Sequence, residues 1–218
     1  MFIVFEGIDG CGKTTQAKLF AKYLQKEGFQ VYLTREPSDN RIGRFFRENY
    51  LEKEASWNVL RDVFMFFADR AEHVELEIEP ALREGKIVVS DRYYHSSIVY
   101  QYVGSLRSRQ KLSLKWLLET ASLFPKPNLV FIIDVDIETA MSRIENRGKY
   151  ARYEFREYLS ELKGMFLKLP ELLRNETIYI VDGIGAVDEV QNRIINSWKS
   201  FLKENRELIQ ARTQSSIS

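Results

Sequence analysis

A glycine-rich segment near the start of the sequence has the residue types and the spacing of a phosphate-binding loop. The segment reads GIDGCGKTT and follows the pattern Gly-x-x-x-x-Gly-Lys-Thr from Gly7 to Thr14. Its glycines allow a tight turn in which successive backbone N–H groups point at phosphate oxygens. Lys13 can reach the terminal phosphates, and the Thr14 hydroxyl can ligate Mg²⁺. We expect the whole loop to hold the phosphates of a nucleotide, through Gly7, Ile8, Asp9, Gly10, Cys11, Gly12, Lys13, Thr14 and Thr15.

The residues on either side of this loop predict the strand and the helix that such a loop requires. Phe2 to Phe5 form a short apolar run typical of a buried strand. From Thr15 to Glu27 apolar residues recur at helical spacing, and Gly28 follows as a helix C-cap. The alternative, a glycine turn that binds nothing, is disfavoured by this strand–loop–helix context.

Apolar strands alternate with helical patterns along the rest of the chain. Further strands are predicted at residues 30–34, 86–90, 128–134 and 177–182. Helical patterns occupy approximately residues 41–53, 57–84, 93–103, 109–123, 136–147, 154–174 and 186–206. The alternation predicts an α/β protein with a five-stranded parallel sheet flanked by helices. Ligands of such sheets bind beyond the carboxyl ends of the strands, where Arg35-Glu36-Pro37 and Asp91-Arg92 are found.

The overall composition argues against several functional classes. The 218 residues include 32 Lys and Arg against 31 Asp and Glu, and a net charge of +1 gives no reason to expect a nucleic acid partner. No apolar run is long enough to span a bilayer, and no basic stretch precedes an apolar one at the N-terminus. Cys11 is the single cysteine, which suits a reducing cytoplasm and, with two His, argues against a zinc site. We therefore expect a cytoplasmic protein without nucleic acid or membrane partners.

Motifs that other nucleotide-binding proteins need are not found. The Asn/Thr-Lys-x-Asp segment with which GTPases read guanine is absent, and no Asp-x-x-Gly switch segment follows the third predicted strand. At 218 residues the chain is also short for a motor or transporter ATPase. What remains is a small kinase that transfers the γ-phosphoryl group to a small acceptor.

Four segments taken together resemble the thymidylate kinase family. They are the GIDGCGKTT loop, TREP from Thr34, FADRAEH from Phe67 and DRYYHSSIVYQ from Asp91, in the family's order. The resemblance implies a P-loop fold of the nucleoside monophosphate kinase type with a short lid, an ATP·Mg²⁺ donor, transfer to dTMP to give dTDP for dTTP biosynthesis, and a homodimer. The expected organisation is one kinase domain over residues 1–206, followed by a frayed tail over residues 207–218.

The residues after the third predicted strand suit a metal ion and an acceptor phosphate. Asp91 ends an apolar strand beside the loop, where its carboxylate and the hydroxyl of Thr14 would ligate Mg²⁺. A guanidinium such as that of Arg92 binds phosphate through paired hydrogen bonds, and the resemblance assigns Arg92 to the acceptor phosphate. The alternative, a surface ion pair between Asp91 and Arg92, is disfavoured by the phosphate loop.

Phe66 and Arg70 are four residues apart on one predicted helix and therefore share a face. By residue type alone, Phe66 would be a core residue, and Arg70 would form a solvated pair with Asp69. The resemblance implies instead that the ring of Phe66 stacks on thymine and that Arg70 reaches the carbonyl edge of the base. It also implies that Ser97 and Gln101 help to read the base.

Other acceptor-site residues are assigned by the same resemblance. Asp9 would lie near the 3′-hydroxyl of the acceptor sugar, and Tyr100 would fill the space of a ribose 2′-hydroxyl, with simple core packing as an equal alternative for Tyr100. Glu36 is expected at the metal ion or at the acceptor. Arg47 would bind the acceptor phosphate, and Arg44 is a rival for that role because the segment before both departs from the family pattern.

A basic segment over residues 143–154 follows the fourth predicted strand and is expected to form the lid. Closing over ATP, it would neutralise charge on the transferred group. The phosphate loop contains no arginine, and family members of this kind place the arginine in the lid. Arg147 or Arg152 is therefore expected to be catalytic, together with Lys13 and Arg92. Arg143 is expected to pack on the adenine of ATP.

Two other functions are open on sequence grounds. A deoxynucleoside kinase would phosphorylate a neutral hydroxyl and would need a carboxylate base, which Glu36 could supply, but it would have no use for Arg92 at an acceptor phosphate. A regulator that binds nucleotide without turnover would not need Lys13, Thr14 and Asp91, and all three are present. The sequence therefore favours a dTMP kinase, in which alignment and charge neutralisation provide most of the catalysis.

Overall fold

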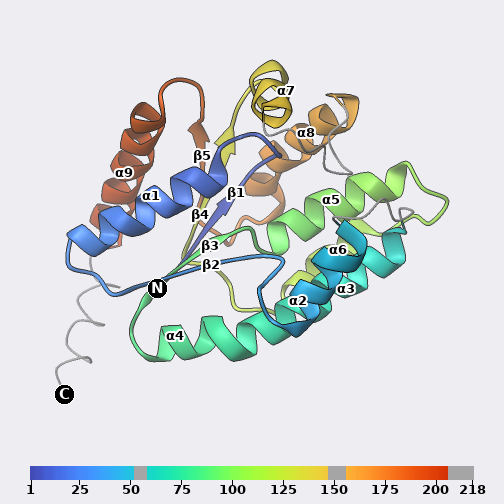
Figure 1. Cartoon of the computed structure of the whole chain (residues 1–218), viewed down its shortest axis with the longest axis horizontal. Helices are drawn as coiled ribbons and strands as arrows, with labels where there is room; N and C mark the ends of the chain where they lie inside the picture. Colours follow the sequence, from blue (N-terminus) through green and yellow to red (C-terminus); the bar gives the residue numbers. More distant parts are fainter. Residues whose placement is uncertain (52–57, 147–155, 206–218) are drawn as a thin grey trace.

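A five-stranded parallel sheet forms the centre of the molecule in the computed structural model, which describes residues 1–51, 58–146 and 156–205. The strands lie in the order β2-β3-β1-β4-β5, and all neighbouring strands are parallel (Figure 1). Their bounds are β1 (Phe2–Glu6), β2 (Val31–Arg35), β3 (Ile87–Asp91), β4 (Leu129–Asp134) and β5 (Ile178–Asp182). The predicted sheet is confirmed.

The central strands are apolar runs because both of their faces are covered. Every residue of β1 is buried, and so is every residue of β4 except Asp134. Such runs are typical of parallel sheets with helices on both sides. The register places Phe5 of β1 opposite Asp91 of β3. The phosphate loop after β1 and the Asp91 carboxylate therefore lie at the same edge of the sheet.

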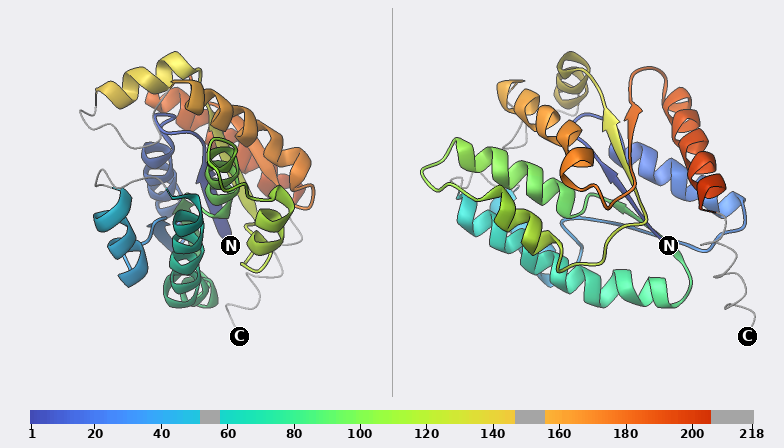
Figure 2. Two further views of the ribbon diagram at one scale, coloured as in Figure 1. Left: turned by 90° about the vertical axis from the view of Figure 1, so that its right-hand side faces the viewer. Right: turned by 180° about the vertical axis from the view of Figure 1, so that it is seen from behind.

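Helices cover both faces of the sheet (Figures 1 and 2). They are α1 (Lys13–Lys26), α2 (Arg41–Phe46), α3 (Val59–His73), α4 (Glu79–Arg83), α5 (Tyr94–Leu106), α6 (Leu114–Ala121), α7 (Ile137–Glu145), α8 (Arg156–Leu172) and α9 (Val187–Glu204), with π-helical turns η1 (Arg47–Leu51) and η2 (Val74–Ile78). On one face α1 packs on α9, with Phe20 edge-on to Trp198. On the other face α5 packs on α8 and α3, with Tyr100 edge-on to Phe166.

The helices follow the sequence patterns, with differences at their ends. The pattern over residues 57–84 is a continuous run of α3, η2 and α4. Helix α6 is shorter than the expected 109–123, because it begins after Ser113, whose side chain accepts the backbone N–H of Trp116 as an N-cap. Helix α5 continues to Leu106, past the expected end at residue 103, because Gly104 and Ser105 are still buried against its neighbours.

Some of the predicted features lie outside the described residues. These are the two candidate catalytic residues of the lid, Arg147 and Arg152, and the expected tail over residues 207–218. The assignment of residues 1–206 to a single domain stays a prediction. Among the described helices, none combines the length and the apolar character needed to cross a membrane.

Candidate active site

The loop between β1 and α1 is shaped by glycines in the left-handed region of backbone space. Gly7, Gly10 and Gly12 have φ values of 136°, 81° and 96°, which residues with side chains rarely adopt. At Gly10 a Cβ atom would also lie 2.3 Å from the carbonyl oxygen of Ala140. Cys11 fills the inside of the turn, and burial raises the pKa of its thiol, so that it acts as a neutral packing group.

Lys13 begins α1, at the helix end where free backbone N–H groups and the helix dipole favour an anion. Its side chain is 7% exposed, and its Nζ lies 3.2 Å from the carbonyl oxygen of Ile8 and 3.6 Å from Oδ1 of Asp9. Oxygen atoms of the loop itself therefore hold the ammonium group beside the place where phosphates would bind.

Thr14 and Asp91 offer oxygen ligands for a divalent cation. Thr14 Oγ1 donates a 2.5 Å hydrogen bond to Asp91 Oδ2, and the other carboxylate oxygen of Asp91 is buried with no hydrogen-bond partner. A buried polar atom of this kind is costly unless a ligand or water satisfies it. In the described part of the chain no three His, Cys, Asp or Glu side chains gather to hold a metal by themselves. The pair fits Mg²⁺, which takes one or two protein carboxylates and draws its other ligands from water and phosphates.

A cavity of about 470 Å³ extends from the phosphate loop toward the start of α9. Arg143 of α7 lies against this cavity and donates hydrogen bonds to the carbonyl oxygens of Cys11 (3.1 Å) and Gly183 (3.3 Å). The phosphate loop and this guanidinium therefore line the same cavity. The packing of Arg143 on adenine stays a prediction, and the cavity gives it room.

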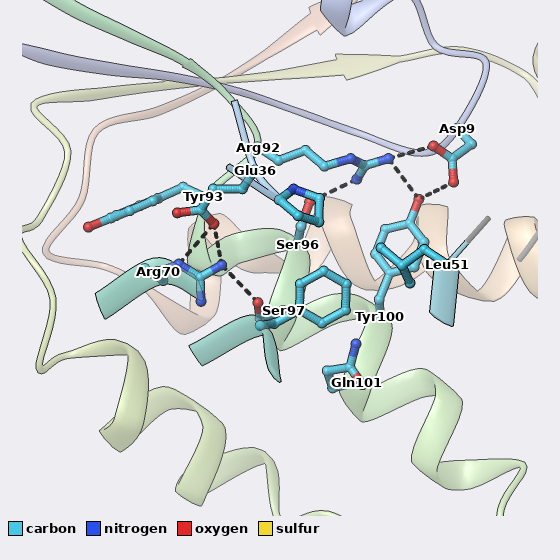
Figure 3. A pocket seen from close by; sticks show the side chains of 12 residues that line it. Asp9, Glu36, Leu51, Arg70, Arg92, Tyr93, Ser96, Ser97, Tyr100 and Gln101 are labelled. Atoms are coloured by element: carbon cyan, nitrogen blue, oxygen red, sulfur yellow. Dashed lines mark hydrogen bonds and ion pairs between the residues drawn. The ribbon is translucent and has the colours of Figure 1, made fainter. Parts of the chain in front are cut away.

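A second, smaller cavity of about 160 Å³ begins at Asp9 (Figure 3). It gathers every residue expected at the acceptor except Arg47: Asp9, Glu36, Phe66, Arg70, Arg92, Ser97, Tyr100 and Gln101. Sequence reasoning missed the rest of the lining: Pro37, Leu51, Tyr93 and Ser96. Because these residues come from well-separated segments, only the fold makes them neighbours. We refer to this cavity as the acceptor pocket.

Arg92 stands at the phosphate-loop end of the acceptor pocket, with an unusual backbone conformation. Its φ of 76° is in the left-handed region. The conformation is held by the hydrogen bond from its N–H to Phe5 O (2.9 Å) and by the Ser90 hydroxyl, which donates to the carbonyl oxygen of Arg92 (2.7 Å). The guanidinium donates to Asp9 Oδ1 (2.5 Å) and to Ser96 Oγ (2.9 Å). Backbone strain of this kind is common at functional sites, where surrounding contacts impose it.

Ser96 is the most informative residue that the sequence analysis missed. Its hydroxyl accepts from Arg92 and donates to Glu6 Oε2 (2.6 Å), a carboxylate fully buried at the end of β1. Glu6 also accepts the backbone N–H groups of Tyr93 (2.8 Å) and Ser96 (3.1 Å) near the start of α5. Arg92 lies before α5, so helical spacing does not point from Arg92 to Ser96. No local pattern marks Glu6 as the anchor of this turn.

Arg70 lies at the far end of the acceptor pocket from Asp9, as Figure 3 shows. It is 1% exposed; its Nε and Nη2 donate to Glu36 Oε2 (3.0 and 2.5 Å), and Nη2 also donates to Ser97 Oγ (2.9 Å). Its Nη1 is buried without a partner. The solvated pair with Asp69 is not formed, because Asp69 is itself buried and accepts hydrogen bonds from the N–H and hydroxyl of Ser38. Burial, with the nearby Glu36 charge, raises the pKa of Asp69.

Tyr100 and Phe66 each combine core packing with a place in the pocket lining. The ring of Tyr100 packs on Phe166, while its hydroxyl donates to Asp9 Oδ2 (3.0 Å). The ring of Phe66 lies edge-on to Phe46, 4.9 Å between ring centres, and also faces the pocket. The alternatives of core residue and site residue are therefore compatible for both aromatics.

Arg47 and Arg44 occupy different surfaces. Arg47 donates to Ser38 O (3.1 Å) and to Asp39 Oδ1 (2.7 Å), and it lines a groove that also contains Thr14 and Asp91. Arg44 donates to the carbonyl oxygen of Asp39 and lines a separate outer groove. Because Arg47 shares a groove with Asp91 and Arg44 does not, the structure favours Arg47 over Arg44 as a residue that binds a phosphate.

The parallel sheet, the phosphate loop after its central strand and two cavities that adjoin the loop define a P-loop phosphotransferase of the nucleoside monophosphate kinase type. A family model described as thymidylate kinase matches residues 5–194. The chain therefore belongs to the thymidylate kinase family.

Similar proteins come from several microorganisms. A probable thymidylate kinase of Pyrococcus horikoshii is 36% identical over 89% of this chain and 93% of its own length. A probable thymidylate kinase of Thermococcus kodakarensis is 37% identical over 94% of this chain and 100% of its own length. A thymidylate kinase of Fervidobacterium nodosum is 36% identical over 93% of this chain and 100% of its own length. The similarity thus extends over both cavities.

Proposed function

We propose that this protein is a dTMP kinase, which transfers the γ-phosphoryl group of ATP to dTMP and releases dTDP for dTTP biosynthesis. The observation that carries the proposal is the polarity of the acceptor pocket. Arg92 stands at its phosphate-loop end, and Arg70 lies at the other end with a buried N–H that has no protein partner. A nucleoside monophosphate has the matching polarity, with an anion at one end and base carbonyl groups at the other.

The donor half of the site is assigned to ATP and Mg²⁺. Residues 7–15 surround the phosphates, and Arg143 packs on the adenine. Thr14 and Asp91 would hold Mg²⁺, which neutralises charge on the β- and γ-phosphates when it is bound. Lys13 acts on the same phosphates from the start of α1.

The acceptor half is assigned to dTMP. The ring of Phe66 stacks on the thymine, Arg70 donates its free N–H to a carbonyl oxygen of the base, and Ser97 and Gln101 complete base recognition. Tyr100 fills the space of a 2′-hydroxyl and, with Arg92, holds Asp9 near the 3′-hydroxyl. The acceptor phosphate is bound by Arg92 and Arg47.

The transfer needs no general base, because the attacking phosphate oxygen is already ionised at neutral pH. Lys13 and Arg92 align the two phosphates in line and neutralise the charge between them, and Arg147 or Arg152 of the lid would add to this. Glu36 is not available as a base, since Arg70 and His73 engage its two oxygens. This occupancy weighs against a deoxynucleoside kinase.

The test is a coupled ADP-release assay with ATP and Mg²⁺ against dTMP, dUMP, dCMP, AMP, UMP and thymidine. A strong preference for dTMP is the expected result. Turnover of thymidine with none of dTMP would indicate a nucleoside kinase, and ATP binding without turnover of any acceptor would indicate a regulator. Either result would overturn the proposal.

The proposal includes a homodimer in the cytoplasm. Phe45 of α2 and Leu60 and Phe64 of α3 are large apolar side chains that are exposed on two helices in contact with each other, and exposed apolar side chains of this size are candidates for an interface. Light scattering coupled to size-exclusion chromatography should give twice the mass of one chain. A mass equal to one chain at micromolar concentration would contradict this part of the proposal.

A further inference from the structure

His73 is a fully buried histidine that the phosphoryl transfer itself does not use. It ends α3, three residues after Arg70, and it does not line the acceptor pocket. Its side chain is 0% exposed and lies between two carboxylates. Its Nδ1 is 3.2 Å from Glu36 Oε1, and its Nε2 is 2.7 Å from Thr34 Oγ1 and 3.4 Å from Glu77 Oε2.

The surroundings of His73 favour the imidazolium form. Burial alone would lower the pKa of His73, but hydrogen bonds and charge attraction from Glu36 and Glu77 raise it to about 9. The hydrogen bond with His73 lowers the pKa of Glu77 to about 2, although burial alone would raise it. Both ring nitrogens then donate, one to the Glu36 carboxylate and one toward Thr34 and Glu77.

Glu36 divides its two oxygens between two cations. Oε2 accepts from Arg70, and Oε1 accepts from His73. A carboxylate held at both oxygens cannot rotate, and it therefore fixes the guanidinium that is bonded to it. Held in this way and by Ser97, Arg70 keeps one buried guanidinium nitrogen, Nη1, without a hydrogen-bond partner, and the residue lines the acceptor pocket.

The outer side of His73 is held as firmly as the inner side. Glu77 Oε2 accepts hydrogen bonds from Tyr32 OH (2.9 Å) and Thr34 Oγ1 (2.9 Å), which ties the π-helical turn after α3 to strand β2. Charges therefore alternate along a chain of contacts that runs from a partly exposed groove to the buried end of the acceptor pocket. The chain consists of Glu77, His73, Glu36 and Arg70.

We infer that His73 is a positioning residue for base selection: through Glu36 it fixes the orientation in which Arg70 meets the base. The inference rests on the proposed function and deepens it. An N–H group at this position can donate a hydrogen bond to a carbonyl oxygen, as in thymine. It disfavours cytosine, which carries an amino group in place of that carbonyl oxygen. His73 thus contributes to the choice between pyrimidines without touching the substrate.

The test compares the wild-type protein with His73→Gln and Glu77→Gln. His73→Gln keeps a side chain that can still donate a hydrogen bond to Glu36 but removes the charge. We measure kcat/KM for dTMP and for dCMP, KM for ATP, and the melting temperature. The expected result for His73→Gln is a fall of about tenfold in the dTMP-to-dCMP ratio, with KM for ATP within about twofold of the wild-type value. Glu77→Gln should shift the ratio in the same direction by about two- to threefold.

The matched control is His95→Gln. His95 is the other fully buried histidine and also pairs with a carboxylate, Glu176 (2.8 Å), but it has no contact with Glu36 or Arg70. This control should lower the melting temperature and leave the dTMP-to-dCMP ratio unchanged. A ratio unchanged in His73→Gln and Glu77→Gln while the wild type prefers dTMP overturns the inference alone. A wild-type protein with no preference for dTMP overturns the proposed function as well.

Discussion

The donor and acceptor halves of this site are built in opposite ways. The donor half is one contiguous loop and the first turn of α1, and its binding groups are mainly backbone N–H groups shaped by glycines. The acceptor half is assembled from the loop, the segment after β2, η1, α3 and α5, and its polar groups are side chains held by other buried side chains. The donor half is encoded by consecutive residues, whereas the acceptor half is formed only when the chain folds.

This difference indicates which property of the enzyme a substitution in each half should change. Phosphate is the same in every nucleotide, so a backbone cradle is sufficient to bind it. Selection of one base and one sugar needs donors in fixed directions, and directions are fixed by further contacts such as those of Glu36 on Arg70. Changes in the donor half, and at Arg92 where the two halves meet, should therefore affect chemistry, whereas changes at the base end of the acceptor half should affect the choice and affinity of the acceptor.

The largest effect should come from the donor half. Lys13→Ala removes the cation at the phosphates, and we expect kcat to fall by about a thousandfold or more while the melting temperature changes little. The assay is ADP release at saturating dTMP, with thermal unfolding beside it. The matched control is Lys22→Ala, an exposed lysine of the same helix that should keep wild-type turnover. Near-normal kcat in Lys13→Ala would remove Lys13 from the mechanism.

Arg92→Ala should have the next largest effect, and it should change the KM of one substrate without changing that of the other. We expect kcat to fall by about a hundredfold and KM for dTMP to rise, with KM for ATP close to the wild-type value, because the guanidinium faces the acceptor side of Asp9. Initial rates with each substrate varied in turn provide the measurement. An equal rise of KM for ATP would show that the two halves are not separate at Arg92.

The stability of the acceptor half should depend on pH through His73. Groups that face the imidazole are Glu36 after β2, Glu77 of η2, and Arg70 and Asp69 of α3. Because the pKa of His73 is raised from 6.5 to about 9, its stabilisation is complete below about pH 6.5 and is lost as pH rises through about 9. This pKa shift corresponds to about 3 kcal/mol of the free energy of unfolding. Urea unfolding at pH 6.5, 8 and 9.5 should show the loss, and His73→Gln should show less of it; parallel curves would contradict the assignment.

The smallest effect should be that of Tyr100→Phe. The ring stays packed on Phe166, and Asp9 loses one hydrogen bond, so kcat/KM for dTMP should fall about three- to tenfold. The preference for dUMP over UMP should persist, because the ring and not the hydroxyl fills the space of the 2′-hydroxyl. Kinetics with dTMP, dUMP and UMP decide this. Loss of that preference would place its origin in the hydroxyl.

Much of the fold and of the donor half was predictable from local patterns. The five strands were visible as apolar runs, and the phosphate loop was visible because its function depends on residue types at fixed spacing along a few consecutive positions. The acceptor residues were found by resemblance, since nothing local distinguishes Phe66 or Arg70 from ordinary helix residues. The helix ends at Ser113 and Leu106 were missed because caps and burial, rather than periodicity, set them.

The sequence by itself determined the parallel α/β sheet, the phosphate cradle and the family. Only the tertiary structure decided that Arg70 pairs with Glu36 and not with its neighbour Asp69, that Glu6 anchors the turn after β3 through Ser96, and that His73 is enclosed between carboxylates. The physical reason is burial. A charged side chain in water needs no particular partner, whereas one that the fold removes from water must be satisfied by whichever group the fold brings to it.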